Sequence, residues 1–166
     1  MNGRNKKYKI VSLFSGIGGF EEGLKYSDLD AEVVFSSEID KFAQKSYIVN
    51  FSDNNLHGDI TNIDEKEIPS HDILMAGFPC QTFSIAGNRN GFDDTRGTLF
   101  FDVLRILREK KPRVVFLENV KNLVSHDHSN TIKVILNSLT ELGYTVDFTI
   151  INSSEMGVPQ NRERTY

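Results

Sequence analysis

Short apolar runs alternate along this chain with longer segments in which apolar residues recur at helical spacing. The apolar runs predict strands at 9–14, 32–37, 73–76, 114–117 and 144–152, with a short extended piece near 57–60. The longer segments predict helices at 20–26, 41–50, 98–110 and 130–142, the last ended by Gly143. Strands that alternate with helices of this length predict βαβ units, and therefore a doubly wound α/β fold with a mainly parallel sheet.

The helical periodicity also predicts which side chains face inward. In the 41–50 helix these are Phe42, Tyr47 and Ile48, and in the 98–110 helix Leu99, Val103, Ile106 and Leu107. The segment from 81 to 97 is polar and glycine-rich, which predicts a long loop of the kind that is usually functional. Since neither a linker nor a repeat interrupts the pattern, we expect a single domain over 1–166.

Composition narrows the class of protein. Charged residues make up 25% of the chain and apolar residues 39%, which is typical of a soluble globular protein. The polar, basic start predicts no signal peptide, and a single cysteine favours a reducing cytoplasm. The four histidines show no metal-ligand spacing, so no metal is expected. The net charge of −4 argues weakly against binding nucleic acid by bulk electrostatics.

Two polar groups follow apolar runs and are candidates for chemistry. The only cysteine, Cys80, follows the run 73–76 in the sequence GFPCQ, and Glu118 follows the run 114–117. In open α/β sheets ligands bind outside the carboxyl ends of strands, so a nucleophile and a proton donor would share one edge. Taken alone, Cys80 is more often a small buried hydrophobe, and Glu118 an ordinary surface residue.

A glycine turn, SGIGG (15–19), joins the first predicted strand to the first helix. It departs from the dinucleotide pattern G-x-G-x-x-G because Glu21 occupies the third glycine position, where a carboxylate would repel a pyrophosphate. Glu38 and Asp59 follow the next two extended segments, where they could bind ribose hydroxyls and an adenine amino group. Each signal alone is weak, but their order favours a pocket for a nucleoside without phosphates.

Seven sequence blocks extend this interpretation. They are LFSGIGGF (13–20), SEID (37–40), GDI (58–60), GFPCQTFS (77–84), RGTLF (96–100), ENV (118–120) and GVPQNRER (157–164). In this order they resemble the DNA cytosine-5 methyltransferases over essentially the whole chain. The resemblance implies a Rossmann-like methyltransferase fold, S-adenosylmethionine as methyl donor, and a flipped cytosine in double-stranded DNA as acceptor. It also implies a cytoplasmic enzyme of the bacterial restriction-modification or phage type.

The resemblance also implies residue roles by position. Cys80 would attack cytosine C6, Glu118 would contact N3 and the exocyclic amine, and Arg164 would hold Glu118, with Arg162 nearby. The implied methyl-donor pocket comprises Phe14, Gly16, Gly18, Glu38, Ile39, Asp59, Ile60 and Leu99. A loop that closes on DNA would include Gln81, Ser84 and Arg96. These residue types suit the reaction, because thiolate addition at C6 places electron density on C5.

The end of the sequence departs from the family pattern, since neither a target-recognition region nor a closing helix follows position 166. A piece of a longer enzyme, one subunit of a split methyltransferase and a degenerate remnant are the three explanations. We expect the isolated chain to be inactive without complementing sequence. Two other classes remain open: a module that binds the donor or DNA without turnover, and a nicotinamide oxidoreductase. Glu21 and the Pro-Cys-Gln turn argue against the oxidoreductase.

Overall fold

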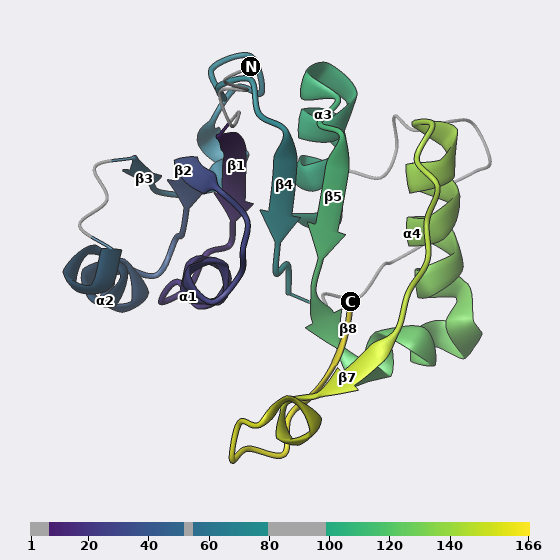
Figure 1. Cartoon of the computed structure of the whole chain (residues 1–166). Coiled ribbons are helices and arrows are strands. Elements are labelled where there is room, and N and C mark those ends of the chain that lie inside the picture. The colour runs from purple at the N-terminus through teal and green to yellow at the C-terminus, as the bar shows by residue number, and fades with distance from the viewer. Residues whose placement is uncertain (1–6, 52–54, 80–98) are drawn as a thin grey trace, which may run out of the picture. The chain divides into compact units, whose positions relative to one another are not determined.

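The computed structural model describes residues 7–51, 55–79 and 99–166 (Figure 1). Two compact units make up the chain: a first unit of Met1–Gly77 with Glu109–Phe116, and a second unit of Phe78–Arg108 with Leu117–Tyr166. The elements, in chain order, are β1 (Tyr8–Leu13), α1 (Gly19–Lys25), β2 (Ala31–Ser37), α2 (Lys41–Phe51), β3 (Leu56–His57), η1 (Ile60–Asn62), β4 (Ile73–Ala76), α3 (Leu99–Lys110), β5 (Val114–Leu117), β6 (Asn119–Val120), η3 (Lys121–Val124), η4 (His126–Ser129), α4 (Asn130–Glu141), β7 (Ile150–Asn152), η5 (Ser153–Met156) and β8 (Glu163–Thr165).

A five-stranded sheet of order β3-β2-β1-β4-β5 runs through the first unit (Figure 1). The central strand β1 pairs in parallel with β2 on one side and β4 on the other, and β2 pairs in parallel with β3. Ile10, Val11 and Leu13 of β1 are fully buried, as expected for a strand in the middle of a parallel sheet. The predicted α/β fold with a mainly parallel sheet is confirmed.

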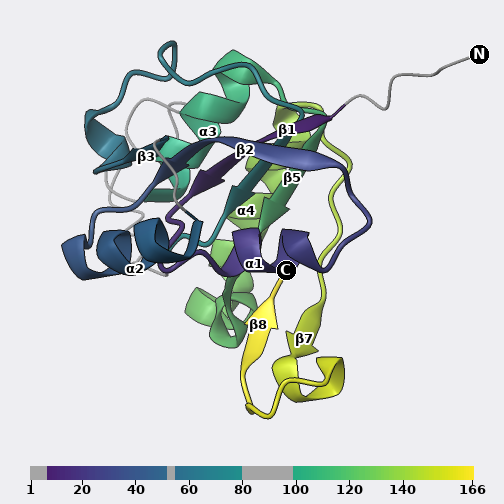
Figure 2. The same cartoon turned by 60° about the vertical axis from the view of Figure 1, so that its left-hand side comes forward.

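The two helices of the first unit, α1 and α2, lie side by side in both cartoon views (Figures 1 and 2). The predicted inward face of α2 is wrong in part: Tyr47 is fully buried, but Phe42 is 78% exposed and Ile48 is 50% exposed. Residues 42 and 47 are five apart, so an α-helix places them about 140° apart around its axis. Both cannot face the sheet, and α2 buries the tyrosine.

The second unit contains α4 and most of α3. The predicted buried face of α3 is confirmed for Val103, Ile106 and Leu107, whereas Leu99 is only half-buried. Gly143, with φ 92°, ends α4 as predicted. Its N–H donates to the Thr140 carbonyl, and the next N–H, of Tyr144, donates to Leu139, which is the hydrogen-bond pattern of a Schellman motif.

A small antiparallel sheet of order β6-β8-β7 in the second unit was not predicted. The strand expected over 144–152 is wrong in extent, because only Ile150–Asn152 forms a strand. β6 and β8 have two and three residues, which is too short for a period of two to be recognised. β7 and β8 lie next to each other and are connected through η5 (Figure 2).

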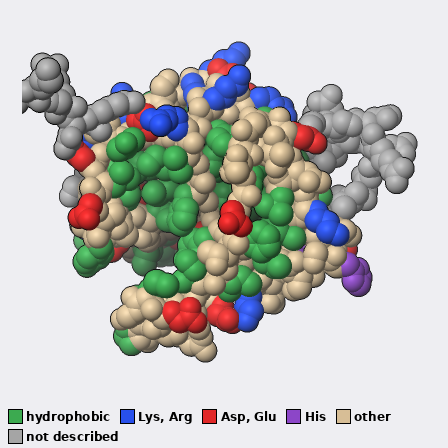
Figure 3. All heavy atoms as spheres, turned by 45° about the vertical axis from the view of Figure 1, so that its right-hand side comes forward, with side chains coloured by type: hydrophobic (Ala, Val, Ile, Leu, Met, Phe, Trp, Pro, Cys, Tyr) green, Lys and Arg blue, Asp and Glu red, His purple; other side chains and the backbone are tan. Residues whose placement is uncertain are grey.

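Membrane-spanning helices and metal-binding groups are both absent from the described residues. No helix among them is both long and apolar enough to span a membrane. No group of three or more histidine, cysteine, aspartate or glutamate side chains among them is placed to bind a metal ion. Apolar side chains reach the surface in several patches (Figure 3). The loop predicted over 81–97 lies outside the described residues.

Candidate active site

The glycine turn after β1 is tied to the end of β2. The Ser15 N–H donates to the Ser37 carbonyl over 3.0 Å, and the Ser15 hydroxyl donates to the same oxygen over 3.3 Å. The Gly18 N–H donates to the Ser15 carbonyl over 2.9 Å and closes the turn. Phe14 and Gly16 have left-handed φ values of 56° and 57°. A phenylalanine in this region is strained, and such strain is common at ligand sites.

The Glu38 carboxylate accepts hydrogen bonds from the backbone of the glycine turn and of Asp40. The Gly16 N–H donates to Glu38 Oε2 over 2.8 Å, and the Asp40 N–H donates to Oε1 over 2.7 Å. The Glu38 N–H donates to the His57 carbonyl and links β2 to β3. A carboxylate oxygen can accept more than one hydrogen bond, so Glu38 keeps capacity for ligand hydroxyls. This arrangement fits the sugar of a nucleoside.

The other residues implied for the donor pocket in the first unit differ in environment. Asp59 caps η1, since Thr61 donates to Oδ1 from its N–H over 3.0 Å and from its hydroxyl over 2.8 Å. The Asp59 carboxylate therefore has a local structural role. Ile39 is largely exposed beside Glu38, whereas Ile60 is buried in the core. Ile39 is thus the apolar side chain that a flat ring could contact.

Glu118 and two arginines come together in the second unit. Glu118 lies between β5 and β6, and β6 pairs with β8 so that Val120 lies opposite Arg164. Arg164 Nε lies 2.8 Å from Glu118 Oε1, and each side chain is 20% exposed. Arg162 Nη2 is 3.7 Å from the same oxygen, and this side chain is 47% exposed. Both ion pairs therefore end on the same carboxylate oxygen, Oε1.

Sequence reasoning missed the role of Asn119. This residue is buried, and its Nδ2 donates to the Phe78 carbonyl over 2.8 Å. Its own Oδ1 accepts from the Val120 N–H. Phe78 is two residues before Cys80, and Asn119 directly follows Glu118. The bond therefore holds the segment that leads to the cysteine beside the segment that carries the carboxylate. The sequence signal that could have indicated this role is the amide residue Asn119 directly after Glu118, at the end of β5.

Tyr166 was also missed. Its backbone exchanges two hydrogen bonds with Thr149, which extend the β7–β8 ladder. Burial raises the pKa of the Tyr166 phenol, and the negative charge of Glu118 raises it further, while Arg162 and Arg164 oppose this effect. The phenol is therefore part of the electrostatic environment of the Glu118 carboxylate.

Four implied site residues, Cys80, Gln81, Ser84 and Arg96, lie outside the described residues. Leu99, the remaining residue implied for the donor pocket, is the first residue of α3 and belongs to the second unit.

The first unit is an α/β unit whose glycine turn donates a hydrogen bond to Glu38, and the second unit holds the Glu118 carboxylate beside two guanidinium groups. The family model of the C-5 cytosine-specific DNA methylases matches residues 8–166, and the chain belongs to this family. S-Adenosylmethionine, the predicted cofactor, is the methyl donor of these proteins.

Curated relatives resemble the chain at high identity. The Type II methyltransferase M1.ScrFI of Lactococcus lactis subsp. cremoris is 56% identical over 99% of this chain and 42% of that protein. The Type II methyltransferase M.HhaI of Haemophilus parahaemolyticus is 53% identical over 95% of this chain and 47% of that protein. A solved structure of Spodoptera frugiperda DNMT2 superposes with a TM-score of 0.77 at 29% identity, covering 96% of this chain and 48% of that one. The chain spans about half the length of these proteins.

Proposed function

We propose that the chain is the N-terminal catalytic portion of an enzyme that transfers a methyl group from S-adenosylmethionine to C5 of cytosine in double-stranded DNA. The proposal includes a covalent bond between Cys80 and cytosine C6. It also includes a requirement for complementing sequence, either a C-terminal region or a second polypeptide. The cytoplasm of a bacterial host is the compartment that fits an enzyme with a free thiol.

One observation carries the proposal: the Asn119–Phe78 hydrogen bond beside the Glu118–Arg164 ion pair. A carboxyl group must reach one edge of a pyrimidine while a thiol reaches C6 of the same ring. The bond ties the residue next to Glu118 to a position two residues before Cys80. The 41 residues that separate Phe78 from Asn119 in sequence are therefore bridged within the second unit, which supports the proposal.

The residues of the donor pocket fit a nucleoside that carries no phosphate. Glu38 presents a carboxylate beside the turn backbone, and Ile39 presents an exposed apolar surface next to it. When bound, S-adenosylmethionine supplies a methyl group on a positively charged sulfur and leaves as the neutral thioether. Glu38 would orient the ribose, and the glycine turn would let the backbone approach the ligand closely.

The proposed reaction requires neither a metal nor an oxidant, because every bond that forms or breaks involves only the thiol, the base, the methyl donor and water. The Cys80 thiolate adds to C6 and forms a sulfur–carbon bond, while the Glu118 carboxyl, in its acid form, donates a hydrogen bond to N3, and the electron pair of the C5–C6 double bond becomes available at C5. After C5 has accepted the methyl group, its proton is lost to water, the sulfur–carbon bond breaks and the thiolate returns to Cys80. Arg164 would hold the Glu118 carboxyl in place through their ion pair.

DNA contacts are proposed for Gln81, Ser84 and Arg96, which the sequence places in the polar segment after Cys80. The target carbon is inaccessible inside a duplex, so the cytosine must leave the stack, and a loop must cover the opened site. Base-edge contacts that specify a sequence would come from the complementing part.

The test combines this chain with the C-terminal half of its relative M1.ScrFI, as a fusion and as two co-expressed polypeptides. We expect radioactive methyl transfer into unmethylated DNA from the combined protein and none from this chain alone. Cys80→Ser should abolish transfer, whereas Tyr26→Phe, at a largely exposed position, should leave it unchanged. A folded combined protein that binds DNA and the donor but transfers no methyl group would contradict the proposal. That result would favour a module that binds without turnover.

A further inference from the structure

We propose that Tyr47 and Glu21, which are buried behind the glycine turn, are positioning residues of the methyl-donor site. The inference rests on the proposed function, because it concerns the same turn and the same strand end. Neither residue is among those that the family resemblance implies for the methyl-donor pocket. Their role would be to fix the shape of that pocket from behind.

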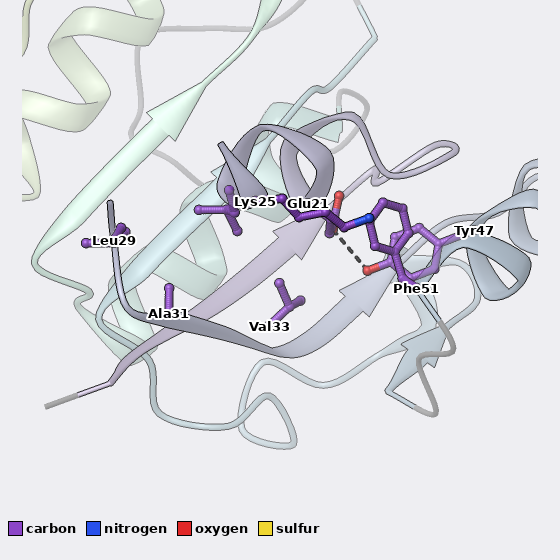
Figure 4. Close-up of a pocket in the computed structure, with 8 residues that line it drawn as sticks. Glu21, Lys25, Leu29, Ala31, Val33, Tyr47 and Phe51 are labelled. Carbon is purple, nitrogen blue, oxygen red and sulfur yellow. Dashed lines mark hydrogen bonds between the residues drawn. The ribbon is translucent and has the colours of Figure 1, made fainter. Parts of the chain in front are cut away.

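The buried polar network connects three elements of the first unit. The Tyr47 hydroxyl of α2 donates to Glu21 Oε1 of α1 over 3.1 Å, as the dashed line in Figure 4 shows. Ser36 Oγ of β2 lies 2.7 Å from the same hydroxyl. With the phenol proton directed to Glu21, the Ser36 hydroxyl is the donor of the second bond. One phenol thus links α2 to both α1 and β2.

The ring of Tyr47 connects to the glycine turn through Phe51. The two rings pack at a centroid distance of 5.1 Å and an angle of 45°. Phe51 in turn lies against Gly18, the N-cap residue of α1, where a Cβ atom would overlap the Phe51 ring. Lys25 Nζ lies over the Phe51 ring, 4.5 Å from its centroid, and holds this ring from α1.

The second connection reaches the end of β2. Ser36 is followed directly by Ser37, whose carbonyl accepts both hydrogen bonds from Ser15. Glu38 comes next, and its carboxylate accepts the Gly16 N–H. A displacement of α2 would therefore move the glycine turn through the contact of Phe51 with Gly18. It would also move Glu38, because Tyr47 of α2 is hydrogen-bonded to Ser36, two residues before Glu38.

The hydrogen bonds of Tyr47 matter for the position of α2, because side chains do not fill the space beside them. Glu21, Tyr47 and Phe51 also line a pocket of about 370 Å³ that is open to solvent, and its apolar side is formed by Leu24, Leu29, Ala31 and Val33 (Figure 4). Close packing normally fixes one helix against another in a protein interior. Where an open pocket lies between the two helices instead of packed side chains, the directional hydrogen bonds of Tyr47 would set the distance between α2 and α1.

Amide hydrogen exchange, followed by NMR on the full 166-residue chain without donor or DNA, tests this inference. Tyr47→Phe keeps the ring and removes only the hydroxyl. We expect the amides of Ser15 and Gly16 to exchange about tenfold faster, while those of Ile10 and Val11 in β1 keep their rates. Tyr26→Phe, at the end of α1 and largely exposed, is the matched control and should change neither set.

Glu21→Gln is a second variant, which retains an acceptor for the Tyr47 hydroxyl and should accelerate the turn amides less than Tyr47→Phe does. A merely structural role would lower protection in β1 and in the turn together, and that result would overturn the inference. Unchanged exchange at Ser15 and Gly16 in both variants would also overturn it. The readout needs no methyl transfer, so its failure leaves the proposed function standing. Conversely, failure of methyl transfer does not alter the exchange result.

Discussion

Asn119 donates a hydrogen bond from Nδ2 to the carbonyl oxygen of Phe78 over 2.8 Å. This contact links two segments that follow different strands, β4 and β5. It places the residue after Glu118 next to the segment that leads to Cys80. One buried amide thereby anchors the backbone that follows β4 to the backbone that follows Glu118.

Asn119→Ala should weaken both the fold and the reaction. The substitution leaves the Phe78 carbonyl without its amide donor, and an unsatisfied buried polar group costs about 1–3 kcal/mol. Urea unfolding should show a loss of this size. Asn122→Ala, at an exposed position three residues on, is the control and should change the free energy of unfolding by less than about 0.5 kcal/mol. Equal effects of the two variants would show that the Asn119 bond contributes nothing specific.

The two arginines near Glu118 should differ in importance. Arg164→Ala removes the 2.8 Å partner, and we expect methyl transfer by the complemented protein to fall by at least about tenfold, since preorganised charge is worth this much in a partly buried site. Arg162→Ala removes a longer, more exposed ion pair and should cost less than about threefold. Steady-state rates at saturating donor measure both. A larger loss for Arg162→Ala would reverse the assignment.

Gly18 and Gly23 offer opposite outcomes for the same substitution. Gly18→Ala puts a methyl group into the Phe51 ring at φ 95°, so it should destabilise the chain by at least about 2 kcal/mol. Gly23→Ala lies inside α1 with open space around it and should stabilise the chain by about 0.5–1 kcal/mol. Thermal unfolding should therefore shift in opposite directions. Shifts of the same sign would contradict the described turn.

His71 should make stability depend on pH. Burial lowers the pKa of His71, and Lys110 lowers it further, against the opposing effects of the Pro69 carbonyl and Asp72. The unfolded chain, with an ordinary histidine pKa near about 6.5, therefore binds more protons than the folded chain just below that pH. The free energy of unfolding should fall as the pH drops from about 6.5 toward the lowered pKa.

His71→Gln should flatten this part of the pH profile, measured by urea unfolding between about pH 7.5 and pH 5. His128→Gln, at an exposed position, is the control and should retain the slope of the parent chain. A His71→Gln profile as steep as that of the parent would assign the pH dependence to other groups.

The sequence predicted the central sheet because its longer strands contain short apolar runs, such as Ile10-Val11 in β1 and Ile73–Ala76 in β4. Ile10, Val11 and Leu13 are fully buried, so pattern and packing agree in the central strand. The predicted elements differ from the observed ones where an element forms only through contacts with distant parts of the chain. β8 has three residues and exists through its pairing with β6 and β7, which no local pattern encodes. In α2, the spacing could not show that Tyr47 rather than Phe42 would be buried.

The candidate site was predictable to a similar extent. The order of the glycine turn, Glu38 and Asp59 along the chain predicted the donor pocket, and the position of Glu118 after an apolar run made it a candidate proton donor. The partnership of Glu118 with Arg164 depends on the β6–β8 pairing, and it came from resemblance rather than from spacing. The Asn119–Phe78 bond and the Tyr47 network involve side chains whose partners are distant in sequence. Only the folded chain identifies them.

Covalent trapping tests the central claim most directly. The chain, complemented by the C-terminal half of M1.ScrFI, would be incubated with donor and duplex DNA in which the target cytosine carries fluorine at C5. Since fluorine cannot leave as the C5 proton does, we predict a denaturation-resistant complex, with mass spectrometry locating the modified base on the peptide that contains Cys80, the only thiol of the chain. A folded complex that binds this DNA and the donor yet forms no adduct, or an adduct on any other residue, would contradict the account.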